Sequence, residues 1–128
     1  MSDLWGSDIG GEATITPAAI LREQASLLGP KTNHDVIGEV TVVADEAYNN
    51  RLKVYFYLVV PALNNYRYLL LSILHGVPEY PLIINAQVLE EQIHVPDQAT
   101  FIERLKFILS SQKTKLVVSS LLGHVRDS

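Results

Sequence analysis

The 128-residue sequence contains no cysteine. A chain without thiols cannot form disulfide bonds, zinc–thiolate sites or a cysteine nucleophile, so a small secreted disulfide scaffold is excluded. The absence of cysteine favours a reducing compartment, and we expect a cytoplasmic protein. The length matches one ordinary domain, which can bury a hydrophobic core without metal or disulfide crosslinks.

The sequence also lacks long apolar runs and an excess of positive charge. No apolar run approaches the roughly 20 residues that a membrane-spanning helix needs. The first residues carry acids and lead into no apolar segment, unlike a secretory signal. The formal net charge of −4 gives no long-range attraction to nucleic acid or anionic lipid. We therefore expect neither nucleic acid nor membrane as a partner.

Motifs of common catalytic and nucleotide-binding sites are missing as well. The sequence has no G-x-S-x-G elbow, no Walker loop and no G-x-G-x-x-G. None of its histidines has a second ligand at the spacing of a metal-binding motif. We therefore assign no catalytic, cofactor-binding or metal-binding residue. An enzyme whose site is assembled from scattered residues stays an alternative.

What the chain does contain is a strong pattern of β-strands, centred on residues 51–76. From Arg51 to Val60 every second residue is aliphatic or aromatic, which is the period of two of a strand. After a break at residues 61–65, residues 66–74 form the next strand. Similar patterns at residues 37–44 and 82–88 predict two more strands, and residues 92–95 allow a fifth. Short connections between them predict an antiparallel meander of three to five strands.

Helices are expected on both sides of these strands in the sequence. Thr16 and Pro17 mark the start of the first helix, and Gly29 and Pro30 mark its end. We expect this helix to cover the sheet with an apolar stripe of Ile20, Leu21, Gln24, Leu27 and Leu28.

Asp97 is placed to cap a C-terminal helix with its own apolar stripe. Ser110 and Ser111 interrupt the pattern, so we expect a second helix to start near Ser111; one kinked helix over residues 98–125 is the alternative. The fold class is therefore α+β, a two-layer sandwich of an antiparallel meander sheet packed against N-terminal and C-terminal helices. Residues 15–128 are expected to form one domain and residues 1–14 a flexible arm.

The candidate interaction residues are aromatic. Tyr55 and Tyr57 share one face of their strand, and Tyr66 and Tyr68 share one face of the next, so we expect the four rings to form one surface. Helices of the same chain covering that face are the alternative. Trp5 lies in a glycine-rich arm, and we expect it to dock onto the body or onto a second copy; a disordered end is the alternative.

These features favour a protein-interaction module, expected to bind a second copy of itself or another protein. The expected architecture resembles small bacterial α+β proteins that act by binding proteins, such as secretion chaperones and toxin-immunity proteins. The alternative is a small-molecule-binding protein or enzyme with a pocket between sheet and helices, involving His75, Tyr80 or His94. We interpret the basic C-terminal residues as a solvated helix face beside the apolar stripe; they are Arg104, Lys106, Lys113 and Lys115.

Overall fold

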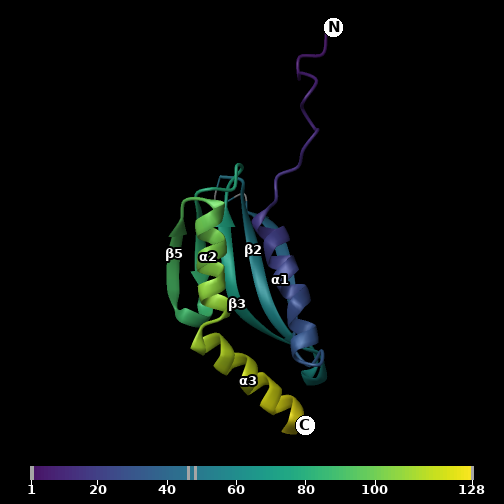
Figure 1. The fold of residues 1–128 in the computed structure, drawn as a ribbon, viewed down its shortest axis with the longest axis vertical. Helices are drawn as coiled ribbons and strands as arrows, with labels where there is room; N and C mark the ends of the chain where they lie inside the picture. Colours follow the sequence, from purple (N-terminus) through teal and green to yellow (C-terminus); the bar gives the residue numbers. More distant parts are fainter. Residues whose placement is uncertain (1, 46, 48, 128) are drawn as a thin grey trace.

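The computed structural model of the chain describes residues 2–45, 47 and 49–127. The N-terminal helix α1 (Pro17–Lys31) is followed by the strands β1 (Ile37–Asp45), β2 (Arg51–Val60), β3 (Tyr66–His75), β4 (Leu82–Ala86) and β5 (Glu91–Val95). The short 3-10 helices η2 (Pro61–Leu63) and η3 (Gln87–Leu89) follow β2 and β4, and the chain ends with α2 (Gln98–Leu109) and α3 (Gln112–Asp127). Figure 1 shows the fold with colours that follow the sequence.

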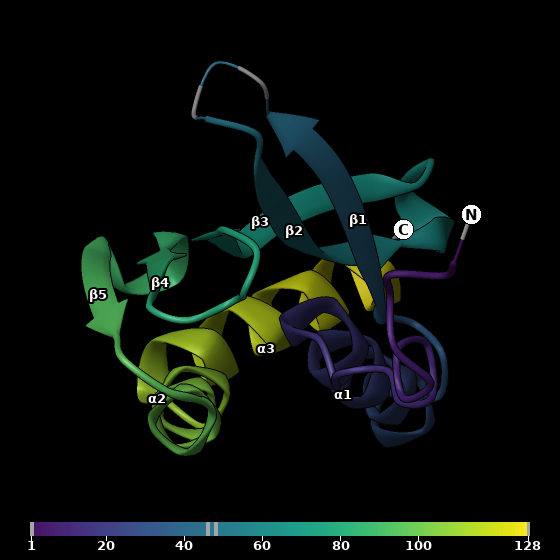
Figure 2. The ribbon, with the colours of Figure 1, turned by 90° about the horizontal axis from the view of Figure 1, so that it is seen from above.

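The five strands form one antiparallel sheet in the order β1-β2-β3-β4-β5, so each strand pairs with its neighbour in sequence. Figure 2 shows that α1, α2 and α3 all lie on one side of this sheet. We call that side the inner face and the opposite side the outer face. The predicted α+β meander is confirmed, with five strands. The C-terminal region forms two helices, so the single kinked helix is wrong.

The core lies between the inner face and the helices. Its most deeply buried side chains are aliphatic or aromatic and come from α1, from the central strands and from α2: Leu21, Val54, Leu71, Ile73, Ile84, Phe101 and Ile108.

The helix caps follow the sequence signals, because the Ala19 N–H donates to Thr16 Oγ1 at 3.1 Å and the Thr100 N–H donates to Asp97 Oδ1 at 2.8 Å. No helix among the described residues is long and apolar enough to cross a bilayer.

The helix α1 turns a different side toward the sheet than its apolar pattern predicts. Its buried residues are mostly small: Pro17, Ala18, Leu21, Ala25 and Gly29. They allow close approach to β1, since a Cβ added at Gly38 would lie 2.7 Å from the Ala25 Cβ. Of the predicted stripe only Leu21 is buried, and Leu27 is 49% exposed. The predicted packing of α1 on the sheet is confirmed, but its centre is shifted: Leu21 and the small residues make the contact, and Ile20 and Leu28 pack at its edge.

The end of α1 also differs from the prediction. The helix continues through Gly29 and Pro30 to Lys31, and the chain reverses at Asn33 and His34, whose φ angles are 53° and 61°. Gly29 does not end the helix in a left-handed conformation. It instead allows the His34 ring to pack closely against α1, because a Cβ at Gly29 would lie 2.8 Å from the His34 Nδ1. The buried Thr32 hydroxyl then holds the turn by donating to the Val36 carbonyl at 2.7 Å.

Candidate binding groove

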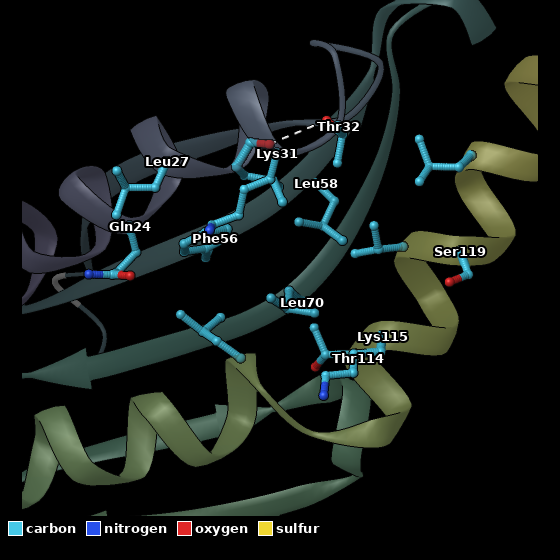
Figure 3. A pocket seen from close by; sticks show the side chains of 14 residues that line it. Gln24, Leu27, Lys31, Thr32, Phe56, Leu58, Leu70, Thr114, Lys115 and Ser119 are labelled. Atoms are coloured by element: carbon cyan, nitrogen blue, oxygen red, sulfur yellow. Dashed lines mark hydrogen bonds between the residues drawn. The ribbon is translucent and has the colours of Figure 1, made fainter.

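An open groove lies over the inner face, between α1 on one side and α2 and α3 on the other. Its main cavity, of about 530 Å³, has walls from the helices and a floor from β2 and β3 (Figure 3). The lining residues are Gln24, Leu27, Leu28, Lys31, Thr32, Phe56, Leu58, Leu70, Leu109, Thr114, Lys115, Val118, Ser119 and Leu122.

A second cavity continues the groove toward the start of α1. This adjoining cavity, of about 410 Å³, is lined by Ile20, Gln24, Ile102, Leu105, Lys106, Leu109 and Ser110. The two cavities share Gln24 and Leu109, so they adjoin within one groove. Four of the five residues of the stripe predicted on α1 (Ile20, Gln24, Leu27 and Leu28) line the groove, and Ile20 and Leu28 also pack against the edge of the core.

The charges in the groove are all positive. Lys31 and Lys115 line the main cavity and Lys106 lines the adjoining one, whereas no Asp, Glu or His is among the described residues that line either cavity. In the described part of the chain, the ion pairs Lys53–Asp45 (3.7 Å) and Arg67–Glu39 (2.6 Å) join residues of the outer face. An apolar floor with lysines at its walls suits a ligand that is both apolar and anionic.

The hydroxyl groups of two groove residues are already used within the fold. The Thr32 hydroxyl bonds to Val36, and the Thr114 hydroxyl donates to the Ile108 carbonyl at 2.7 Å. A nucleophile needs a neighbouring base, and the groove lining offers neither imidazole nor carboxylate for that role. The described residues also include no group of three or more metal-ligating side chains.

No protein-family model, curated protein or solved structure matches this chain.

The four candidate tyrosines do not form one surface. Tyr55 and Tyr57 lie on the outer face with ring centroids 6.1 Å apart, and the Arg67 guanidinium lies 4.0 Å from the centre of the Tyr57 ring. Tyr66 and Tyr68 pair with Val60 and Leu58, which places them on the inner face, because residues directly opposite each other share a face. The expectation of a single four-tyrosine surface is therefore wrong.

A β-bulge explains this division. The pairing of β2 with β3 passes from Phe56↔Leu71 to Tyr57↔Leu69, so Leu70 is an extra residue in β3. Strict alternation from Leu71 would have placed Tyr66 and Tyr68 on the outer face with the other two rings. Nothing in the apolar run at residues 69–71 marks the bulge, since three leucines in succession fit either face.

Tyr66 and Tyr68 instead line a separate cavity on the other flank of α3. This cavity, of about 440 Å³, is also lined by Leu63, Val117, Ser120, Leu121 and His124. The two rings are partly covered by α3 of the same chain, which is the alternative stated for the tyrosines above. Whether either pair of tyrosines contacts a partner stays a prediction.

Trp5 is 75% exposed and Leu4 is 85% exposed, so the arm does not dock onto the body of the same molecule in this structure. Figure 1 shows the arm leaving the N-terminal end of α1 and extending away from the sheet and helices. The division into an arm over residues 1–14 and a domain over residues 15–128 stays a prediction, and Met1, Glu46, Tyr48 and Ser128 lie outside the described residues.

A pocket between sheet and helices is present, but the residues expected to serve it lie elsewhere. His75 is buried with its Nδ1 2.8 Å from the Gly76 carbonyl oxygen, and His94 is exposed on the outer face of β5. The Tyr80 ring lies 6.4 Å from the Phe101 ring, and burial, Glu79 and Asp97 together raise the pKa of its hydroxyl. None of the three lines the groove. Lys106 and Lys115, two of the residues interpreted as a solvated helix face, do line it, as does Lys31, which no sequence signal marks.

Proposed function

We propose that the protein is a cytoplasmic interaction module whose groove binds an acidic, amphipathic segment of another protein. One observation carries this proposal: an apolar groove with Lys31, Lys106 and Lys115 in its walls and no carboxylate among its described lining residues. The chain as a whole has a net charge of −4, so the sign inside the groove is opposite to that of the molecule.

The physical basis is apolar surface in the groove that the fold leaves exposed to solvent. Leu27 of α1 lines the main cavity and Ile102 of α2 lines the adjoining one, and they are 49% and 48% exposed. Covering such side chains is favourable by about 25 cal/mol per Å² of apolar surface. The lysine stems add apolar contact and their ammonium groups can hold carboxylates at the rim. An amphipathic segment supplies both kinds of group at once.

The test is site-specific photo-crosslinking in the native host. A photoreactive residue replaces Leu27 in the groove, and the matched control carries it at Val43, which is 46% exposed on the outer face. We expect a cross-link from position 27 to a partner segment that is acidic and amphipathic, and none from position 43. Cross-links from position 43 alone, or to segments without acids, would overturn the proposal.

Charge reversal sharpens this test. Lys31→Glu combined with Lys115→Glu should abolish the cross-link, because two cations of the main cavity become anions facing an acidic segment. Lys113→Glu is the matched control, since Lys113 is exposed in the same helix and lines neither groove cavity. Equal loss in both variants would show a general charge effect and not binding in the groove.

A small anionic amphiphile is the second candidate. The main cavity alone, at about 530 Å³, falls in the range of roughly 300–1,000 Å³ that is usual for small-molecule sites. Native mass spectrometry of the protein purified from its host tests this candidate. We expect an added anionic mass that is lost in the Lys31→Glu, Lys115→Glu variant if a small molecule is the ligand.

A further inference from the structure

The arm, residues 2–14, has the chemistry that the groove selects. Asp3, Asp8 and Glu12 are its charged residues, and it contains no Lys, Arg or His. Its large apolar side chains are unburied: Leu4 is 85%, Trp5 75% and Ile9 61% exposed. A ring as large as tryptophan is rarely kept in water, because its burial contributes much of the energy of an interface.

Resting on the function proposed above, we propose that the arm of one copy binds in the groove of a second copy of this chain. The charges are complementary: Asp3 and Asp8 flank Trp5 in the arm, and Lys31 and Lys115 flank the main cavity. Trp5 fills the main cavity over its apolar floor, and the two carboxylates lie beside the two ammonium groups. An acidic segment of another partner then competes with the arm for the same groove.

The arm does not occupy its own main cavity in this structure. Thr16 caps α1 with an extended backbone (φ −87°, ψ 158°), and the chain before it runs away from the body (Figure 1). The arm can reverse most easily at Gly10 and Gly11, because glycine adopts turn conformations without steric cost. Gly11 lies five residues before Thr16, and Trp5 lies five residues before Gly10.

A reversal at these glycines returns Trp5 to about the level of Thr16. The residues of α1 that line the main cavity, from Gln24 to Lys31, lie eight to fifteen residues further along the helix. At 1.5 Å of rise per residue they are about 12 to 22 Å from Thr16 along the helix axis. An arm that folds back at Gly10 and Gly11 therefore ends before its own main cavity, whereas the arm of a second copy can enter the groove from the open side.

Sedimentation equilibrium of the full chain tests the proposal. We expect a reversible dimer whose dissociation constant rises by about thirtyfold or more in Trp5→Ala, the size of change that removal of a buried aromatic anchor produces. Lys31→Glu combined with Lys115→Glu should weaken the dimer by at least about tenfold. The matched controls Ser7→Ala in the arm and Lys113→Glu beside the groove should leave the dissociation constant unchanged.

A charge exchange tests direct contact. Asp3→Lys with Asp8→Lys should disrupt the dimer alone and restore it when combined with Lys31→Glu and Lys115→Glu. Trp5 is the single tryptophan of the chain, so its emission should shift to shorter wavelength as dimer forms. Emission that is already shifted in a monomer would place the arm on its own body and overturn the proposal.

A dimer that is insensitive to Trp5→Ala, or a strict monomer at millimolar concentration with an exposed indole, would also overturn it. These results leave the groove function untouched, because the cross-link from position 27 to an acidic segment of another protein is measured independently. Loss of that cross-link with an intact arm-dependent dimer would instead show that the groove serves self-association alone.

Discussion

Asp97 shows how one side chain can define an element boundary. Its carboxylate accepts hydrogen bonds from the backbone N–H and from the side chain of Thr100 at the start of α2. These hydrogen bonds hold the pKa of the carboxyl below its ordinary value of 3.8. The bonds favour the charged form, since an ionised oxygen is the stronger acceptor. A carboxyl with a lowered folded-state pKa stabilises the fold above its unfolded-state pKa and loses that contribution as the pH falls through the folded-state value.

Asp97→Asn makes this contribution measurable. Asparagine can still cap the helix but does not titrate. We therefore expect the wild type to be more stable than the variant at pH 6, and the difference in urea midpoint to shrink as the pH falls from about 4 to 2. Urea unfolding at several pH values checks this. A difference that stays constant with pH would show that the charge of Asp97 does not contribute.

Single residues with a strong local preference could be predicted from the sequence. Thr16 and Asp97 cap their helices as expected. Gly29 could not be predicted, because the same residue suits a left-handed helix end and a close contact. Only the position of His34 in three dimensions decides between these two roles.

The packing of α1 on β1 depends on the absence of a side chain at Gly38. The Ala25 Cβ and Cα lie 2.7 and 2.8 Å from the position that a Cβ at Gly38 would occupy. These atoms belong to the backbone and to the first carbon of a side chain, so they cannot move aside by rotation. An added methyl group must push the helix away from the strand.

Gly38→Ala should therefore lower the free energy of unfolding by about 1–3 kcal/mol, as overpacking usually does. The matched control is Gly123→Ala in α3, where a Cβ would meet nothing within 4 Å. That variant should be more stable by about 0.5–1 kcal/mol, because alanine favours the helix over glycine. Urea unfolding of both variants checks the pair. Equal stability of Gly38→Ala and the wild type would contradict the tight contact.

Hydrophobic patterning predicted each helix but not the side of α1 that faces the sheet. The sequence pattern assumes that large apolar residues belong to the core. In α1 the small residues Ala18, Ala25 and Gly29 make the contact, and Leu27 is left in the groove. A groove that binds apolar ligands imposes the same residue preference as a core, so periodicity alone cannot separate the two.

At the level of the whole molecule, the helices cover one face of the sheet and leave the other to solvent-facing rings and ion pairs (Figure 2). The arm adds no packing to this body, since its large side chains are exposed. The stability of the isolated molecule should therefore come from residues 15–127.

Deletion of residues 2–14 tests this division. At a concentration at which the chain sediments as a monomer, the free energy of unfolding should change by no more than about 0.5 kcal/mol, the usual effect of a surface change. Urea unfolding of the full and shortened chains checks this, with far-ultraviolet circular dichroism confirming the fold of both. A large loss of stability in the shortened chain would show that the arm packs on its own body.

The order of elements and the meander could be predicted because each connection is short and each strand has its own pattern. The groove could not be predicted, because it is formed by residues from α1, β2, β3, α2 and α3 that are distant in sequence. All five strands, for example, lie between Lys31 and Lys115 in the sequence.

The bulge at Leu70 also constrains how the length of this protein can change over evolution. The extra residue reverses the alternation of side chains along β3, which places Arg67 on the outer face with Glu39 and turns Tyr66 and Tyr68 to the inner face beside α3. A second insertion between Tyr66 and Leu70 would exchange these positions and turn a cation toward the inner face. Length variation among relatives is therefore expected in the connections between strands, with a fixed residue count between Tyr66 and Leu71.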